Sequence, residues 1–196
     1  MNDIFLETIK ILDGKIFNLS YHQARYESVL KYFGVDKVQD LGSIITPPQN
    51  GLYRCRLVYD IKGSIDASYH SYQKREINLL KILHDDTIEY SMKYANREKL
   101  DALFAQRGNG DDVLIVKNGL ATDTTIANIA FFDGKRWLTP VLPLLHGTTR
   151  QRLLDEGKIV EEEIHIQDIE RFKQVALMNA MIDFAIITKN PKELFC

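Results

Sequence analysis

The sequence of 196 residues has little cysteine and no excess of charge of either sign, and both features exclude classes of protein. Its only cysteines, Cys55 and Cys196, provide neither a disulfide framework nor the ligand spacing of a metal site, so we expect a reducing compartment. Its 25 basic and 27 acidic residues give a net charge of −2, which argues against binding to nucleic acid or to an anionic membrane surface.

Long apolar runs are also missing. No stretch approaches the roughly 20 apolar residues that a membrane-spanning helix needs, and the first ten residues lack the basic and apolar regions of a signal peptide. From these absences we expect a cytoplasmic protein with no membrane partner. The sequence also has no internal repeat and no glycine-rich phosphate loop of the nucleotide-binding kind.

Short apolar segments joined by tight turns predict an α+β fold with mostly antiparallel sheet. Asp13-Gly14 and Lys62-Gly63 each separate two strand-like runs, which predicts two hairpins in the first part of the chain. Between these hairpins, apolar residues as far as Phe33 have the spacing of one helix face and predict a helix. Ser20 is the predicted cap of this helix, and Gly34 ends it.

The second part of the chain repeats this mixture of elements. We expect, in order, a strand at 87–92, a helix opening at Lys93, a strand and turn and further extended segment at 112–123, two strands at 127–140, a helix at 147–156, a helix from Asp168 to about Met178, and a strand at 181–188. A boundary near 84–90 would leave two small lobes, residues 1–87 and 88–196. Each lobe is marginal in size alone.

Several polar groups could carry chemistry. Each also has a plain structural explanation, because exposed lysines are usually solvated, Thr148-Thr149 at a helix start can serve as a cap, and Arg25 on a helix can form an ion pair. A helix start with free N–H groups does favour an anion. Taken together, the amine of Lys93, the carboxylate of Asp123 and this anion-binding helix start are the groups that pyridoxal phosphate requires.

The order of four motifs makes the sequence resemble the class IV aminotransferases, the fold-type IV pyridoxal-phosphate enzymes. This family includes branched-chain aminotransferase, D-amino-acid aminotransferase and 4-amino-4-deoxychorismate lyase. The motifs are "FLETIKILDGKIFNLSYHQARYE" at 5–27, "MKYANREKL" at 92–100, "NGLATDTTIANIAFF" at 118–132 and "LTPVLPLLHGTTRQRLL" at 138–154. The resemblance covers most of the chain. It implies a two-lobed fold, pyridoxal 5'-phosphate as cofactor, a small amino substrate and a homodimer.

The resemblance also assigns roles to individual residues. Lys93 matches the lysine that binds the cofactor covalently, and Arg25 matches an arginine that binds its phosphate. Thr149 matches a phosphate-binding threonine, with the backbone N–H of Thr148 beside it. Thr125 and Ile126 fall in a loop whose backbone holds the same phosphate.

Two further assignments and two departures concern the rest of the site. Arg54 and Arg56 lie on the strand that, in this family, offers side chains to substrate carboxylates. Asp123 stands where the family has glutamate at the pyridine nitrogen, and it is one methylene shorter. The family also has one or two strands before the segment that starts here at Phe5, so we expect a pocket wall or part of the dimer contact to be missing or supplied differently.

Within the family, a lysine followed after two residues by Asn96-Arg97 is most similar to the lyase. The resemblance therefore implies a lyase of folate precursor synthesis, in which Lys93 moves the proton. An amino-acid aminotransferase and a non-catalytic relative stay open as alternatives, because one lysine serves both reactions and because of Asp123. We also expect the positive end of a helix beginning at Lys93 to promote its neutral amine.

Overall fold

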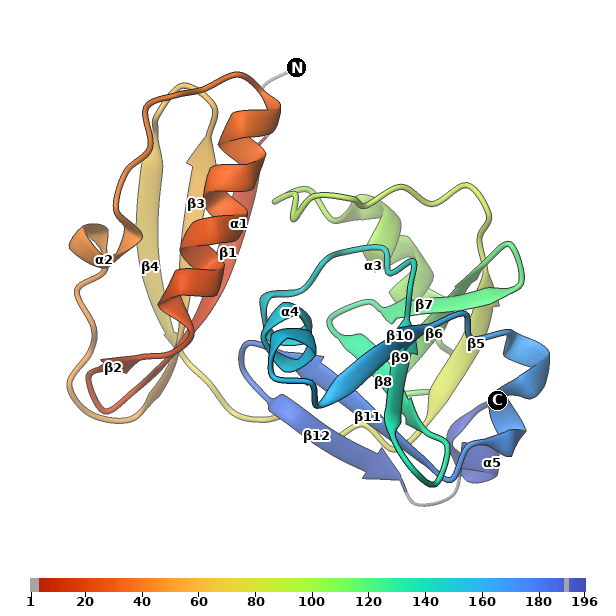
Figure 1. Ribbon diagram of the computed structural model, residues 1–196. Helices are drawn as coiled ribbons and strands as arrows, with labels where there is room; N and C mark the ends of the chain where they lie inside the picture. The colour runs from red at the N-terminus through yellow and green to blue at the C-terminus, as the bar shows by residue number, and fades with distance from the viewer. Residues whose placement is uncertain (1–3, 189–190) are drawn as a thin grey trace. The chain divides into compact units, whose positions relative to one another are not determined.

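The computed structural model describes residues 4–188 and 191–196, which fall into two compact units (Figure 1). The first unit comprises the described residues up to 74 together with 92–96, and the second comprises 75–91 and the described residues from 97 onward. The sequence predicted one boundary, after residue 87. The segment 92–96 belongs to the first unit because main-chain hydrogen bonds join Lys93 to Leu6 and Ala95 to Ile4.

The first unit is a four-stranded antiparallel sheet with strand order β2-β1-β3-β4. Its elements are β1 (Ile4–Leu12), β2 (Lys15–Ile16), α1 (Leu19–Tyr32), α2 (Leu41–Ile44), β3 (Leu52–Asp60) and β4 (Ile65–Ser71). Both predicted hairpins are present. At the first, Asp13 and Gly14 have φ values of 47° and 77°, the left-handed pair that a two-residue hairpin turn of type I′ requires.

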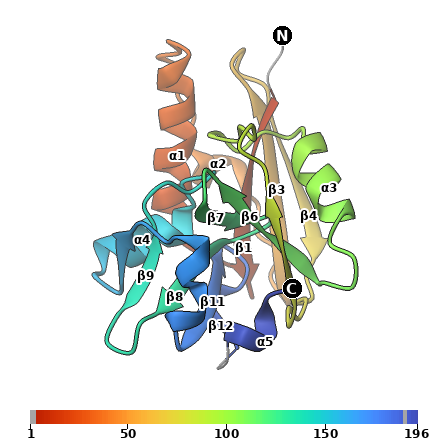
Figure 2. The ribbon, with the colours of Figure 1, turned by 90° about the vertical axis from the view of Figure 1, so that its right-hand side faces the viewer.

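Helix α1 lies along one face of this sheet (Figures 1 and 2). Its buried residues Tyr26, Val29 and Leu30 pack against inward-facing side chains of β1 and β3, so the predicted helix and its apolar face are confirmed. The predicted cap is wrong. Asn18, in the left-handed region with φ of 53°, occupies the N-cap position, and Ser20 lies inside the helix.

The second unit contains an eight-stranded sheet in the order β10-β9-β8-β7-β6-β5, with β11 paired to both β8 and β12. Its elements are β5 (Leu80–His84), α3 (Glu98–Ala105), β6 (Asp112–Lys117), β7 (Leu120–Thr124), β8 (Asn128–Phe132), β9 (Trp137–Pro140), α4 (Thr148–Asp155), β10 (Ile159–Glu162), the 3-10 helix η1 (Ile166–Arg171), β11 (Gln174–Asn179), β12 (Asp183–Thr188) and α5 (Pro191–Leu194). All pairs are antiparallel except β5 with β6 and β9 with β10. The predicted α+β fold with mostly antiparallel sheet is confirmed.

Three predictions in this part of the chain are wrong. Residues 87–92 form no strand, and helix α3 begins at Glu98, five residues after Lys93, so the positive end of a helix does not explain a neutral amine at that lysine. The helix predicted from Asp168 to Met178 is η1 followed by β11. Strand β11 carries a continuous buried apolar run because it lies between two partner strands, and periodicity alone does not separate such a run from a buried helix.

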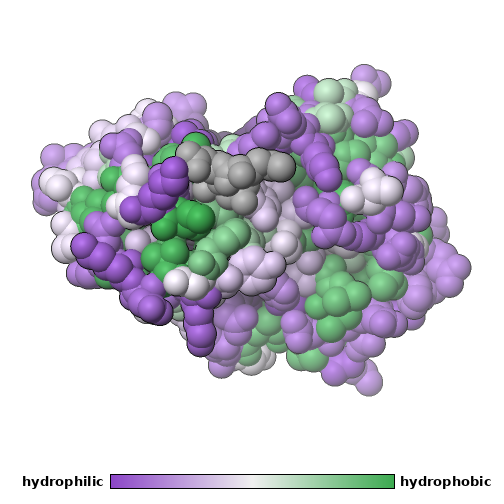
Figure 3. All heavy atoms as spheres, turned by 90° about the horizontal axis from the view of Figure 1, so that it is seen from above, coloured by the Kyte–Doolittle hydropathy of each residue, from purple (hydrophilic) through white to green (hydrophobic). Residues whose placement is uncertain are grey.

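The surface carries hydrophobic residues among hydrophilic ones. In Figure 3 green groups of hydrophobic residues lie scattered between purple hydrophilic ones. Among the described residues, the most exposed large hydrophobic side chains are those of Tyr32 and Leu142. Among the described residues, no helix has the length and apolar character needed to cross a membrane.

Candidate active site

Three side chains form a buried charged cluster in the first unit. Glu7 on β1 is fully buried, and it faces α1 because it shares the inward alternation of Phe5 and Ile9. Arg25 donates from Nε to Glu7 Oε1 over 2.7 Å and from Nη2 to Glu7 Oε2 over 2.5 Å. His22 Nδ1 lies 2.6 Å from the same Oε2. Two parallel bonds therefore fix the orientation of Arg25, the predicted phosphate-binding arginine.

The charges within this cluster compensate each other. Burial raises the pKa of Glu7, but the charge of Arg25 and hydrogen bonds from His22 and Arg25 outweigh it and lower this pKa to about 2. An ionised carboxylate only accepts hydrogen bonds, so His22 Nδ1 carries a proton. Burial lowers the pKa of His22, so the ring is neutral at pH 7. Its Nε2 is then a buried acceptor, and it has no hydrogen-bond partner in the described part of the chain.

Lys93 lies beside β1 of the same unit. Its main-chain oxygen accepts a hydrogen bond of 2.9 Å from Leu6 N, and Tyr94 forms an antiparallel bridge with Phe5. The Lys93 side chain is half-buried, and its charge helps to lower the pKa of His22. The structure thus brings the predicted cofactor lysine within electrostatic range of the cluster that contains Arg25.

The two predicted substrate-binding arginines lie on the other face of the sheet. Arg54 and Arg56 alternate along β3 with Cys55 and Leu57, which are buried in the core with α1. Arg54 is exposed and Arg56 is half-buried. The structure therefore separates these side chains from that of Arg25, and their role toward a substrate stays a prediction.

Asp123 supplies a buried carboxylate in the second unit. Its Oδ1 accepts a hydrogen bond of 2.7 Å from Asn128 Nδ2, and its Oδ2 accepts one of 2.9 Å from the backbone N of Leu145. Burial raises the pKa of Asp123 to about 6, although these bonds and the charge of Arg150 oppose the rise. Its negative charge is thus incompletely stabilised, and a cation placed against the carboxylate would stabilise it.

Asn128 connects this carboxylate to the segment that precedes α4. It lies directly opposite Asp123 in the register of β7 and β8, and its Nδ2 also donates to the oxygen of Leu145 over 2.8 Å. A Cβ added at Gly147 would lie 2.0 Å from Asn128 Oδ1. Position 147 therefore requires glycine, and the two segments meet closely around Asp123.

Thr125 and Ile126 form the tip of the turn between β7 and β8. The turn is closed by a hydrogen bond of 2.9 Å from Thr124 N to Ala127 O, and Thr124 Oγ1 accepts one of 3.1 Å from Ala127 N. The Thr125 hydroxyl points into the protein and donates to Asp112 Oδ1 over 2.7 Å. The Thr125 side chain is therefore occupied, Ile126 is exposed, and the role that the resemblance implies for the backbone of this tip toward a phosphate stays a prediction.

The start of α4 has the features of an anion site. Thr148 and Thr149 are buried, Gly147 at the N-cap has no side chain, and the first turn contains no acidic residue. The Thr149 hydroxyl is buried and finds no hydrogen-bond partner among residues 4–188 and 191–196. Buried hydroxyls are normally bonded, so this donor, at the positive end of a helix, fits an anionic ligand.

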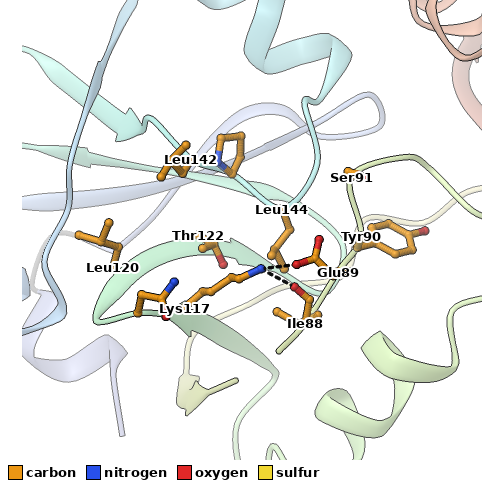
Figure 4. A pocket seen from close by; sticks show the side chains of 11 residues that line it. Ile88, Glu89, Tyr90, Ser91, Lys117, Leu120, Thr122, Leu142 and Leu144 are labelled. Carbon is orange, nitrogen blue, oxygen red and sulfur yellow. Dashed lines mark hydrogen bonds and ion pairs between the residues drawn. The ribbon is translucent and has the colours of Figure 1, made fainter. Parts of the chain in front are cut away.

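A pocket of about 250 Å³ opens elsewhere in the second unit (Figure 4). Its lining includes Leu120, Thr122 and Leu142, and Lys117 Nζ donates into its wall, to Ile88 O and to Glu89. Thr122 faces this pocket, so Asp123, the next residue of β7, points to the other face of the strand. The predicted site residues are absent from its lining.

Several residues that shape the site were not predicted. Glu7 gave a usable signal, because it is an acidic residue at an inward position of an alternating strand. Asn128 appeared only as part of a motif. Arg97, which donates from Nη2 to the oxygen of Thr125 over 2.9 Å, gave no sign of its partner, because the two residues are 28 positions apart.

Comparison with known proteins decides the family. The model of the class IV amino-transferases matches residues 87–189, which is more than half of the chain. The chain belongs to the class IV aminotransferase family. An uncharacterised protein of Haemophilus influenzae, 44% identical over 181 residues, covers 89% of this chain and 96% of its own length.

Two solved structures are similar to this class IV chain over most of its length. A "putative 4-amino-4-deoxychorismate lyase" from Haemophilus somnus 129PT is 36% identical with a TM-score of 0.84, over 92% of this chain and 97% of that one. The PLP-bound form of a "hypothetical aminotransferase" from Mycobacterium tuberculosis has a TM-score of 0.78 over 94% of this chain and 80% of that one. At 18% identity, the second likeness shows a common fold only.

Proposed function

We propose that this class IV family member is a pyridoxal-phosphate-dependent lyase that converts 4-amino-4-deoxychorismate to 4-aminobenzoate and pyruvate, a step of folate precursor synthesis. The observation that carries the proposal is 36% identity, over nearly the full length of both chains, to the Haemophilus somnus protein that bears this name. The sequence of Lys93 followed after two residues by Asn96-Arg97 supports the same choice.

The residues present fit the cofactor. Asp123 is a buried carboxylate that lacks a full counter-charge, which suits a protonated pyridine nitrogen. Thr149 has a buried hydroxyl without a partner in the described chain, at an uncapped helix start that suits a phosphate. Arg25, which the resemblance assigns to the phosphate, is held rigidly by Glu7. When bound, pyridoxal phosphate supplies an electron sink for the electrons of a bond broken at the α carbon.

The protein's own groups would then move one proton. Lys93 would hold the cofactor covalently in the resting protein, and its amine would be free when substrate is bound. This free amine would remove the proton from the carbon that bears the substrate amino group. The C–O bond that joins the ring to the enol-pyruvyl group would break, and the amine would return the proton to the methylene carbon of that group, which gives pyruvate. Asp123 would stay ionised and hold positive charge at the pyridine nitrogen. Aromatisation of the remaining ring favours the products.

Two measurements test this function. The purified protein should show a visible absorption band with pyridoxal phosphate that is lost in Lys93→Ala, and it should release 4-aminobenzoate from 4-amino-4-deoxychorismate. A band without 4-aminobenzoate would reject the lyase. Amino transfer from L- or D-amino acids to 2-oxoglutarate or pyruvate would then identify the alternative, a class IV aminotransferase. The absence of the band would point to a non-catalytic relative.

We further propose that the protein acts as a homodimer in the cytoplasm. The support for the dimer is the resemblance carried by the sequence motifs, because in this family the partner subunit helps to complete each site. Sedimentation velocity of the purified protein tests the dimer, and a single species with the mass of one 22.6 kDa chain would reject it.

A further inference from the structure

Three side chains form hydrogen bonds with the tip between β7 and β8. Arg97 Nη2 donates to the oxygen of Thr125 over 2.9 Å, and Asn179 Nδ2 donates to the oxygen of Ile126 over 3.1 Å. The hydroxyl of Thr125 is bonded to buried Asp112. A tight turn at a surface is usually among the more mobile parts of a protein, so this number of bonds to two residues indicates a function for the tip.

The bond from Arg97 also sets the direction of one N–H group. The peptide unit between Thr125 and Ile126 is planar and trans, so its C=O and N–H point in opposite directions. When Arg97 holds the oxygen on one side, the N–H of Ile126 faces the other side. Within the described part of the chain, that N–H has one partner, a long contact of 3.4 Å to Thr124 Oγ1, so it can still donate strongly to a ligand.

Arg97 is fixed well enough to do this. Its side chain is 28% exposed, and its Nε lies 3.6 Å from Asp101 Oδ1, one turn further along α3. The arginine follows directly on the lysine segment 92–96, at the point where the chain enters the second unit. Arg97, which belongs to the lysine motif, thus contacts Thr125, which belongs to a different motif of the sequence.

We infer that Arg97 is a positioning residue, which orients the Thr125–Ile126 peptide so that its N–H binds the phosphate of the cofactor. The inference rests on the proposed function for the identity of the ligand. It assigns to Arg97 no contact with substrate or with the reacting atoms. Its effect is confined to the phosphate, so substitution of the arginine should not change the affinity for a ligand that lacks the phosphate.

The test compares pyridoxal phosphate with pyridoxal, which has no phosphate. In Arg97→Gln the dissociation constant for pyridoxal phosphate should rise about tenfold, the effect of one misplaced hydrogen bond to an anion, while that for pyridoxal changes less than twofold. Arg107→Gln is the matched control, because Arg107 Nη1 also donates to a main-chain oxygen, that of Phe104 on the same helix. It should leave both constants unchanged. An equal change for both ligands in Arg97→Gln, or no change, would overturn the inference.

A second measurement needs no covalent cofactor. In the cofactor-free protein, inorganic phosphate should shift the amide resonance of Ile126, and Arg97→Gln should abolish that shift. Arg97→Lys keeps the charge but loses the planar fork, so it serves if the glutamine variant does not fold, and it should reduce the shift. If phosphate shifts Ile126 through Arg97 but Lys93 never binds pyridoxal phosphate, the proposed function fails and this inference stands. If phosphate does not shift the Ile126 amide resonance of the wild-type protein, the inference about Arg97 is overturned.

Discussion

The buried carboxylate of Asp123 makes the stability of the cofactor-free protein depend on pH in a defined direction. Burial raises its pKa from the ordinary 3.8 to about 6, so the folded state binds a proton more tightly than the unfolded state does. This stabilisation is complete below pH 3.8 and is lost as the pH rises through 6. The difference corresponds to about 3 kcal/mol, of which about 2 kcal/mol falls between pH 4 and pH 7.

The substitution that isolates this effect is Asp123→Asn. An amide does not titrate, but it cannot reproduce both acceptor contacts, to Asn128 and to Leu145, so we expect a constant loss of about 1–3 kcal/mol at every pH. On top of this offset, the wild type should lose about 2 kcal/mol relative to the variant between pH 4 and pH 7. Urea unfolding, followed by the fluorescence of Trp137 in the second unit, measures the constant offset and the pH-dependent loss. Trp137 is the single tryptophan of the sequence.

Two additions complete this experiment. Asp155→Asn, on the exposed surface of α4, should run parallel to the wild type. Saturating pyridoxal phosphate should remove the wild-type loss above pH 6, because a positive pyridine nitrogen against Asp123 keeps the carboxylate ionised without penalty. If wild type and Asp123→Asn show the same pH dependence from 4 to 7, the carboxylate is not destabilised by burial and the argument fails.

Two further variants test the remaining polar groups. Glu7→Gln should destabilise the first unit by about 3 kcal/mol at pH 7, because it removes one member of a buried ion pair. The stabilisation that Glu7 provides is present above pH 4.5 and is lost as the pH falls toward 2. Near-UV circular dichroism of the edge-to-face pair Tyr26–Tyr59 reports this, with exposed Glu27→Gln as a control of unchanged stability. Thr149→Val should stabilise the cofactor-free protein by about 1–3 kcal/mol by removing an unbonded buried hydroxyl, yet weaken binding of pyridoxal phosphate about tenfold; equal or tighter binding in titrations would count against a phosphate at α4.

Local chemistry was sufficient to predict the tight turns of this fold and its helices α1 and α4. Asp13-Gly14 and Asn118-Gly119 both adopt left-handed conformations at their two positions, which few residue pairs other than these favour. The apolar spacing of α1 likewise predicted its buried face. In each of these cases the information lies within a few consecutive residues, so a single sequence is enough.

Contacts between distant segments were not predictable in this way. The neighbours of Lys93 predict a helix start, but its backbone pairs with Leu6, 87 positions earlier, and the helix begins only at Glu98. Strand β11 was mistaken for a helix because its neighbours in the sheet, not its own pattern, decide its conformation. The pairings of Glu7 with Arg25 and of Arg97 with Thr125 depend on such tertiary contacts as well.

The way in which this protein would hold a phosphate follows from its charges. The chain has a net charge of −2, and the guanidinium of Arg25 is already neutralised by Glu7, so neither the chain as a whole nor that cluster attracts an anion through excess positive charge. The groups that remain are oriented donors, namely the hydroxyl of Thr149, the start of α4 and the N–H of Ile126. Oriented dipoles bind only a ligand of the right shape, whereas excess charge binds any anion. In the proposed function, recognition of the phosphate therefore depends on residues such as Arg97, which fixes the direction of the Ile126 N–H.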